Sequence, residues 1–222
     1  MDEKLIVLDL SKLVVEHGKV PNEKFGYSDP AIYFDDYTGG TKPFRITLLN
    51  MGVHSGTHCD TPSHFLFDEK GPTAKTISDY EIASFVGRAS ILDFYGHGSV
   101  TPQDLAKYRV SVVENGHIPI IMNGKNEMDC FTPASRAELA SWNPKLIIAG
   151  EGWDHVSPED PDGSLYPDTE YYLRHAQIPV IMNIDHLMMS RVRDGDLIVA
   201  APIKLQGVEA APVRLLAIKG VP

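Results

Sequence analysis

The sequence has 222 residues, of which 43% are hydrophobic and 23% are charged, proportions typical of a globular domain. Its 30 acidic residues exceed its 20 basic residues, and the net charge of −10 argues against a nucleic acid or an anionic membrane surface as partner. No apolar run approaches the roughly 18 residues of a membrane-spanning helix. The two cysteines form no disulfide framework. We therefore expect one cytoplasmic domain covering residues 1–222.

The predicted elements are short, and strands outnumber helices. Strands are expected where β-branched and aliphatic residues cluster, at residues 5–10, 44–51, 88–94, 118–122, 145–149, 180–184, 197–202 and 213–218. Helices are expected after Thr-Pro or acidic starts, at residues 101–108, 132–142 and 168–176. Turn-forming residues predict a loop at 18–42. These elements predict a mixed α/β fold with a strand-rich core, but not the order of its strands.

A cluster of histidines follows the strand expected at 44–51. His54, His58, Asp60 and His64 are separated by even intervals, so an extended segment would project all four to one side. Two imidazoles and a carboxylate are the donor set of a catalytic Zn²⁺ or Mn²⁺ site with an open position. The alternative is a group of ordinary histidines. Burying them without a metal would leave several costly unpaired polar groups, so we favour the metal site.

The same stretch resembles a known family signature. His54-Ser-Gly-Thr-His58-Cys-Asp60-Thr-Pro-Ser-His64 is similar to the H-x-G-T-H-x-D-x-P-x-H motif of the Putative cyclase family, which includes kynurenine formamidase (arylformamidase) and isatin hydrolase. Three further segments resemble family segments, namely Asp9-Leu10-Ser11, Gly152 to Ser157, and the run from Ala201 to Arg214.

This resemblance implies a swivelling β/β/α-type fold and a homodimer or homotetramer. It implies metal ligation by His54, His58 and Asp60, with His64 as the proton-transfer residue. Asp154, in the segment around Gly152, is a candidate to orient a ligand histidine from the second coordination sphere.

Family members similar to kynurenine formamidase hold a second zinc with a downstream histidine and glutamate. The positions that align with these residues here are Glu170 and Met182. A thioether is a poor ligand for such metals, so we expect one divalent metal, Zn or Mn. Glu170 remains a candidate additional ligand or acid/base group, or a solvated residue in the first turn of a helix.

The implied activity is hydrolysis of a small-molecule amide, lactam or lactone by a metal-activated water, with aryl formamides or cyclic amides as the substrate class. Two alternatives remain open at this point. One is a metal-binding protein of the same fold without turnover, and the other is a metal-dependent lyase or cyclase.

Overall fold

The structure of the chain is a computed structural model. It describes residues 5–12, 31–37, 44–123, 130–150, 153–157, 159–160 and 166–221. The strand-rich α/β fold predicted above, with short helices, is confirmed. Among the described residues, no helix is long and apolar enough to cross a membrane.

A closed sheet forms the centre of the molecule. Its strands pair in the order β14-β13-β7-β9-β11-β12-β4, and β4 pairs again with β14 to close a barrel of seven strands. These strands are β4 (His58–Asp60), β7 (Val86–Phe94), β9 (Ile118–Asn123), β11 (Ile147–Ala149), β12 (Val180–Met182), β13 (Leu197–Pro202) and β14 (Ala210–Lys219). An eighth strand, β1 (Ile6–Asp9), pairs with the C-terminal part of β14. It lies on the same edge of β14 as β4, which pairs with the N-terminal part.

The barrel strands alternate between two hydrophobic cores. Residues Ile120, Ile148 and Ile181 face the interior, whereas Ile121 and Ile147 face outward. This two-residue period follows from the pleat of a strand. Because β7, β9, β11 and β12 run parallel, their connections cross over the outside as helices and cover the outward side chains.

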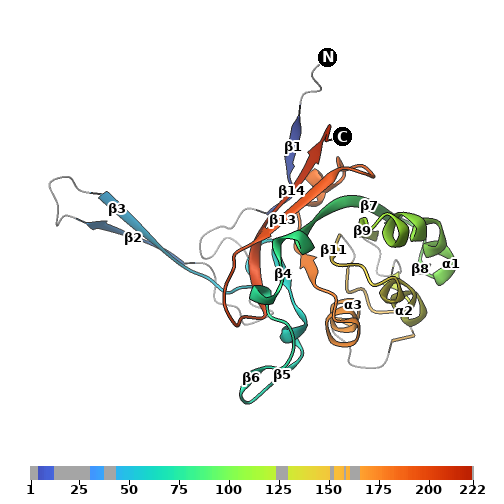
Figure 1. The fold of residues 1–222 in the computed structure, drawn as a ribbon, viewed down its shortest axis with the longest axis horizontal. Helices are drawn as coiled ribbons and strands as arrows, with labels where there is room; N and C mark the ends of the chain where they lie inside the picture. Colours follow the sequence, from blue (N-terminus) through green and yellow to red (C-terminus); the bar gives the residue numbers. More distant parts are fainter. Residues whose placement is uncertain are drawn as a thin grey trace.

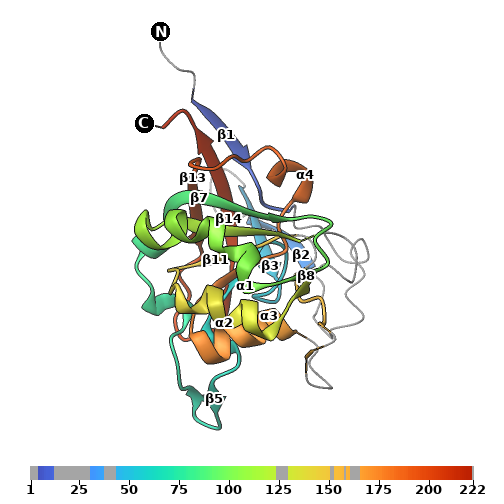
Figure 2. The same ribbon diagram turned by 90° about the vertical axis from the view of Figure 1, so that its right-hand side faces the viewer.

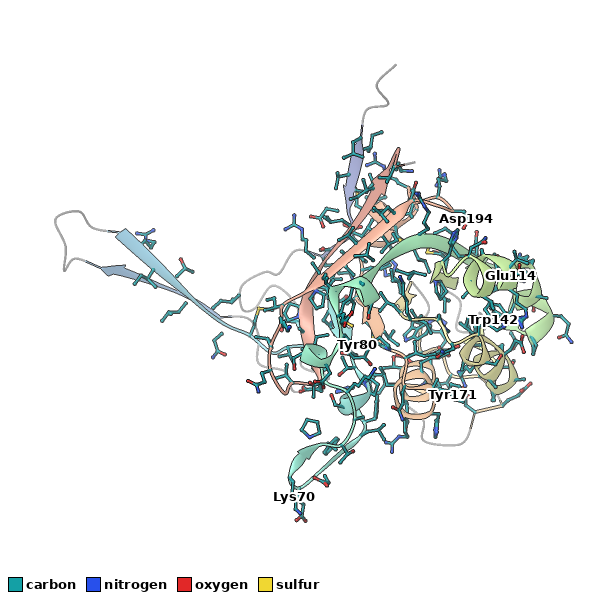
Figure 3. All side chains as sticks on the ribbon, viewed as in Figure 1. Lys70, Tyr80, Glu114, Trp142, Tyr171 and Asp194 are labelled. Atoms are coloured by element: carbon teal, nitrogen blue, oxygen red, sulfur yellow. The ribbon has the colours of Figure 1, made fainter. Side chains whose placement is uncertain are left out.

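The helical layer covers one side of the barrel (Figures 1 and 2). Its α-helices and following turns are α1 (Pro102–Leu105), η4 (Ala106–Tyr108), η5 (Val110–Glu114), α2 (Pro133–Ser141), α3 (Pro167–Glu170) and η6 (Tyr171–Ala176). In Figure 3, Trp142 and Tyr171 lie on this side, and both contribute to the outer core. Tyr80 packs instead against the core inside the barrel.

The remaining elements are small. They are η1 (Pro62–His64), β5 (Phe67–Asp68), β6 (Gly71–Pro72), η2 (Ile77–Asp79), η3 (Ile82–Phe85), β8 (Ser99–Val100), β10 (Cys130–Phe131) and α4 (His186–Met189). β5 pairs with β6, and β8 pairs with β10.

A long hairpin stands apart from the barrel. Its strands β2 (Ala31–Tyr37) and β3 (Phe44–Asn50) pair with each other, and the ribbon extends away from the body (Figure 1). The prediction of a loop over 18–42 was therefore wrong for residues 31–37, because pairing with β3 makes them a strand. The rest of that predicted loop lies outside the described residues.

Candidate metal centre

Strand β4 supplies two of the predicted ligands. Cys59 points into the barrel core, so its neighbours His58 and Asp60 point to the outer face, where they are 8% and 3% exposed. Backbone pairing holds β4 on both sides, with Asp60 opposite Val180 of β12 and Ala210 of β14. The two side chains therefore start from a rigid, doubly paired strand.

The turn before β4 brings His54 over the same face. Gly56 adopts a φ of 66°, a left-handed conformation that glycine reaches without strain. His54 Nδ1 then lies 2.8 Å from Asp60 Oδ1, and His58 Nε2 lies 3.4 Å from the same oxygen. The structure thus brings His54, His58 and Asp60 together around one carboxylate oxygen.

A set of hydrogen bonds fixes this turn to the strands around it. Gly56 O accepts hydrogen bonds from His58 Nδ1 (2.9 Å) and from Asn183 Nδ2 (3.0 Å). Thr57 Oγ1 donates to the carbonyl oxygen of Asn183 and accepts from the backbone N–H of Lys12. Because a carbonyl oxygen only accepts, His58 Nδ1 must carry its proton, which leaves Nε2 to face Asp60.

His64 lies beside this group, at the end of η1. Its ring centroid is 4.5 Å from that of His54 and 4.9 Å from that of Phe65. Burial lowers the pKa of His64 below its ordinary value, although the charge of Asp60 opposes the shift. His64 is therefore largely neutral at pH 7 and able to accept a proton.

The charges in the cluster stabilise one another. Burial raises the pKa of Asp60, but His58 and His54 outweigh that effect and hold the net pKa well below the ordinary range. Burial likewise lowers the pKa of His54, but Asp60 and Glu209 outweigh it and leave the net pKa above the ordinary value. Asp60 is thus an ionised carboxylate at neutral pH.

Glu209 is a member of the cluster that the sequence did not reveal. Its Oε1 lies 3.3 Å from His54 Nε2, the ring nitrogen opposite the one that faces Asp60. Glu209 immediately precedes β14, next to the C-terminal segment that resembles the family. An acidic residue at that place was the available signal, but nothing local connects it with a histidine 155 positions away.

Two other predicted residues lie in separate interactions. Glu170 forms an ion pair with Arg174, with Oε1 3.0 Å from Nε, and the Glu170 side chain is 38% exposed. Asp154 accepts hydrogen bonds from the backbone N–H groups of Asp168 and Thr169 and from the hydroxyl of Thr169. Its hydrogen bonds in the described part of the chain thus go to α3 and not to a ligand histidine.

The donor atoms of the cluster suit a divalent metal. One ligand atom each from His54, His58 and Asp60 lie within 4.8 Å of one another, and so do one each from His54, His64 and Glu209. Imidazole nitrogens and a carboxylate oxygen are ligands of Zn²⁺ and Mn²⁺ alike. The structure therefore fits the predicted donor set, with His54 shared between the two groups.

Known proteins resemble this chain in sequence and in fold. The chain is 29% identical over 172 residues to a kynurenine formamidase of Bacillus thuringiensis (strain Al Hakam), and the aligned region covers 77% of this chain and 78% of that protein. Its fold is similar to that of isatin hydrolase A from Labrenzia aggregata, with a TM-score of 0.68, 18% identity and coverage of 96% and 93%. A structure described as a potential metal-dependent hydrolase with cyclase activity matches with a TM-score of 0.63, 22% identity and coverage of 99% and 100%.

The sequence model of one family also matches the chain. It is described as Putative cyclase, and it matches residues 8–160. The match begins in β1, includes the whole histidine cluster and continues past α2, so it contains the three predicted ligands and His64. With more than half of its length matched, the chain belongs to the Putative cyclase family.

Proposed function

We propose that this protein is a metal-dependent hydrolase that cleaves a non-peptide amide, lactam or lactone bond, with aryl formamides or cyclic amides as the substrate class. The observation that carries the proposal is the convergence of His54, His58 and Asp60 on one point, with His64 beside them. The kynurenine formamidase relative and the isatin hydrolase neighbour support the substrate class.

His54, His58 and Asp60 would hold one divalent metal, Zn or Mn. When bound, such a metal supplies Lewis acidity toward a carbonyl oxygen and makes water more acidic. Asp60 supplies negative charge that offsets the charge of the cation. Met182 pairs in register with His58 but contributes a thioether, so it adds no suitable ligand for a second metal.

His64 would perform the proton transfers. Because it is neutral near pH 7, one of its ring nitrogens accepts the proton of the attacking water and then returns it to the leaving nitrogen or oxygen. Phe65 holds the ring from one side by packing, which restricts the directions in which His64 can present that nitrogen.

The test uses purified protein stripped of metal and reloaded with Zn²⁺ or Mn²⁺. N-formylkynurenine, isatin and a simple lactone are offered in turn, and we expect hydrolysis of at least one that chelation abolishes and reloading restores. Asp60→Asn provides the matched variant, because it keeps the shape of the ligand but removes its charge. Complete inactivity of loaded protein on all three classes would leave the alternative of a metal-binding protein without turnover.

A lyase or cyclase reaction at the same site is the second alternative. Hydrolysis in water enriched in ¹⁸O must place the label in the product, whereas elimination or ring closure leaves the product unlabelled. Mass spectrometry of the product therefore separates the reaction types.

We further propose a cytoplasmic location, which the two buried free cysteines, Cys59 and Cys130, support.

A further inference from the structure

The two histidines that face Asp60 present different nitrogens to it. His54 uses Nδ1, whereas His58 uses Nε2. A histidine nitrogen binds a metal through its lone pair, so the opposite ring nitrogen must carry the hydrogen in the neutral ring. The group that accepts this hydrogen decides the tautomer and sets the orientation of the ring.

The acceptor behind each ring is visible in the structure. Behind His58 it is the carbonyl oxygen of Gly56, 2.9 Å from Nδ1. Behind His54 it is the carboxylate of Glu209, with Oε1 3.3 Å from Nε2. Each acceptor takes the hydrogen of the ring nitrogen opposite the one that would bind the metal, so the two histidines are arranged alike although they would bind through different nitrogens.

Glu209 is held in place by its own backbone. Its carbonyl oxygen accepts hydrogen bonds from the N–H (2.9 Å) and the hydroxyl (2.7 Å) of Thr61, the residue after β4. The next residue, Ala210, pairs with Asp60 in the sheet. The side chain of Glu209 therefore starts from a point fixed relative to the three predicted ligands, as a group that orients a metal ligand must.

We propose that Glu209 is a positioning residue of the metal centre, which fixes the orientation of His54 through Nε2 and so presents Nδ1 to the metal. This inference rests on the proposed function, because it assumes that His54, His58 and Asp60 bind a metal. Glu209 acts in it through His54 and does not touch the cation. The competing arrangement is a second cation held directly by His54, His64 and Glu209, whose donor atoms are also close together.

The experiment measures binding of Zn²⁺ and of Mn²⁺ to metal-free protein by isothermal titration calorimetry, in the wild type, Glu209→Ala and Glu209→Gln. Loss of an outer-sphere partner weakens metal binding by about 10- to 100-fold. We therefore expect one cation per chain throughout, with the affinity lowered by that factor in Glu209→Ala. In Glu209→Gln the loss should be smaller, because the amide oxygen still accepts from Nε2.

Two controls separate positioning from folding and from charge. Thermal unfolding of the metal-free variants should resemble that of the wild type, while the rise in Tm on adding metal should shrink in Glu209→Ala. Glu114→Ala removes an exposed acid on the helical side of the molecule (Figure 3) and should bind metal as the wild type does. Glu114→Ala therefore controls for the loss of one negative charge in Glu209→Ala.

The outcomes distinguish the possibilities. Unchanged affinity in Glu209→Ala overturns the inference but leaves the proposed function standing. Two cations per wild-type chain, reduced to one in Glu209→Ala with the tighter site unchanged, would make Glu209 a ligand and also overturn it. A wild-type chain that binds neither cation overturns the proposed function and this inference together.

Discussion

At the scale of single residues, His64 differs from the three predicted ligands because its ring packs against His54 and Phe65 and it is not part of the group around Asp60. Replacing it should therefore affect turnover and not metal uptake. We expect His64→Gln to lower kcat by about 10²- to 10⁴-fold, the usual contribution of a proton-transfer group, with one metal still bound. Steady-state kinetics and elemental analysis of the same sample check both parts.

His97→Gln is the matched control, since His97 lies on an exposed loop after β7 and near Asp104. It should retain the kcat of the wild type. Full turnover in His64→Gln would remove His64 from the mechanism.

Asn183 gives a second prediction at this scale. Its side chain contacts Gly56 O and Lys12 Nζ, and its φ is 59°. Asn183→Gly loses the contacts but accepts the left-handed backbone, whereas Asn183→Ala loses the contacts and adds roughly 1–2 kcal/mol of strain. In urea unfolding with metal bound, the wild type should therefore be the most stable, Asn183→Gly less stable and Asn183→Ala the least stable.

Metal titration of the same two variants isolates the role of the side chain. Both should bind metal more weakly than the wild type, and to a similar degree, because both release the Gly56 carbonyl that orients His58. A loss of affinity in Asn183→Ala alone would attribute the effect to backbone strain instead.

The residues around the metal centre were predictable to different degrees. The even spacing predicts an extended segment that projects His54, His58 and Asp60 to one side, and the structure does bring the three together. Only His58 and Asp60 owe this to a strand, because His54 lies in the turn before β4. Glu209 and Asn183 could not be found this way, because each reaches the cluster through the pairing of β4 with a distant strand or its end. Local sequence patterns carry no information about such pairings.

At the scale of elements, each predicted strand matches a strand of the structure, and each of the three predicted helices matches a helix, which η4 continues after α1 and η6 continues after α3. The closure of the sheet was not predictable, because it depends on β4 pairing with β14 across about 150 residues of chain. The sequence predicts only an extended segment at the short β4, and pairing with its two neighbours makes it a strand.

A network of charged residues links α2, α3 and the segment before α3. Arg136 pairs with both Asp160 and Asp168, and Asp168 and Asp154 each accept a hydrogen bond from the other's backbone N–H. Two carboxylates thus contact the guanidinium, and the third, that of Asp154, is joined to them through Asp168. Desolvation, followed by the charge of Asp168, raises the pKa of Asp154 to about 7.

This shift predicts how stability depends on pH. The ordinary pKa of an aspartate is 3.8, so the folded chain binds the Asp154 proton more tightly than the unfolded chain does. Its contribution to stability is fully present below about pH 4 and is lost as the pH rises through about 7. Asp154→Asn cannot titrate, so the stability advantage of the wild type over this variant should shrink between pH 4 and pH 7. Urea unfolding at several pH values measures it, and a difference that does not change with pH would contradict the assignment.

At the scale of the whole molecule, the two ends of the chain meet on the barrel. Asp9 forms an ion pair with Arg214 at 2.5 Å, and the backbone N–H of Leu215 donates to Ser11 Oγ. Two segments that resemble the family from opposite ends of the sequence are therefore one structural unit, with β1 beside β14 (Figure 2). This unit also supports the turn of the metal centre, because the backbone N–H of Lys12 donates a hydrogen bond to Thr57 Oγ1.

The β2–β3 hairpin forms a sheet of its own, separate from the barrel. Its strands pair with no other strand in the described part of the chain, and three of its apolar side chains, Ile46, Leu48 and Leu49, are 40%, 58% and 56% exposed. A two-stranded hairpin alone is at best marginally stable in water. Exposed apolar surface of this kind is typical of contact sites between proteins, which favours the homodimer or homotetramer predicted from the family.

We therefore predict that the protein sediments as a homo-oligomer and that Leu48→Glu combined with Leu49→Glu shifts it toward the mass of one chain. Charges on both faces of β3 would be buried without partners in an interface, which disfavours association. Leu187→Glu is the control, because Leu187 is 79% exposed but lies on α4 and not on the hairpin. Sedimentation velocity at several concentrations gives the result, and a wild-type monomer at all of them would show that the hairpin has no partner of its own kind.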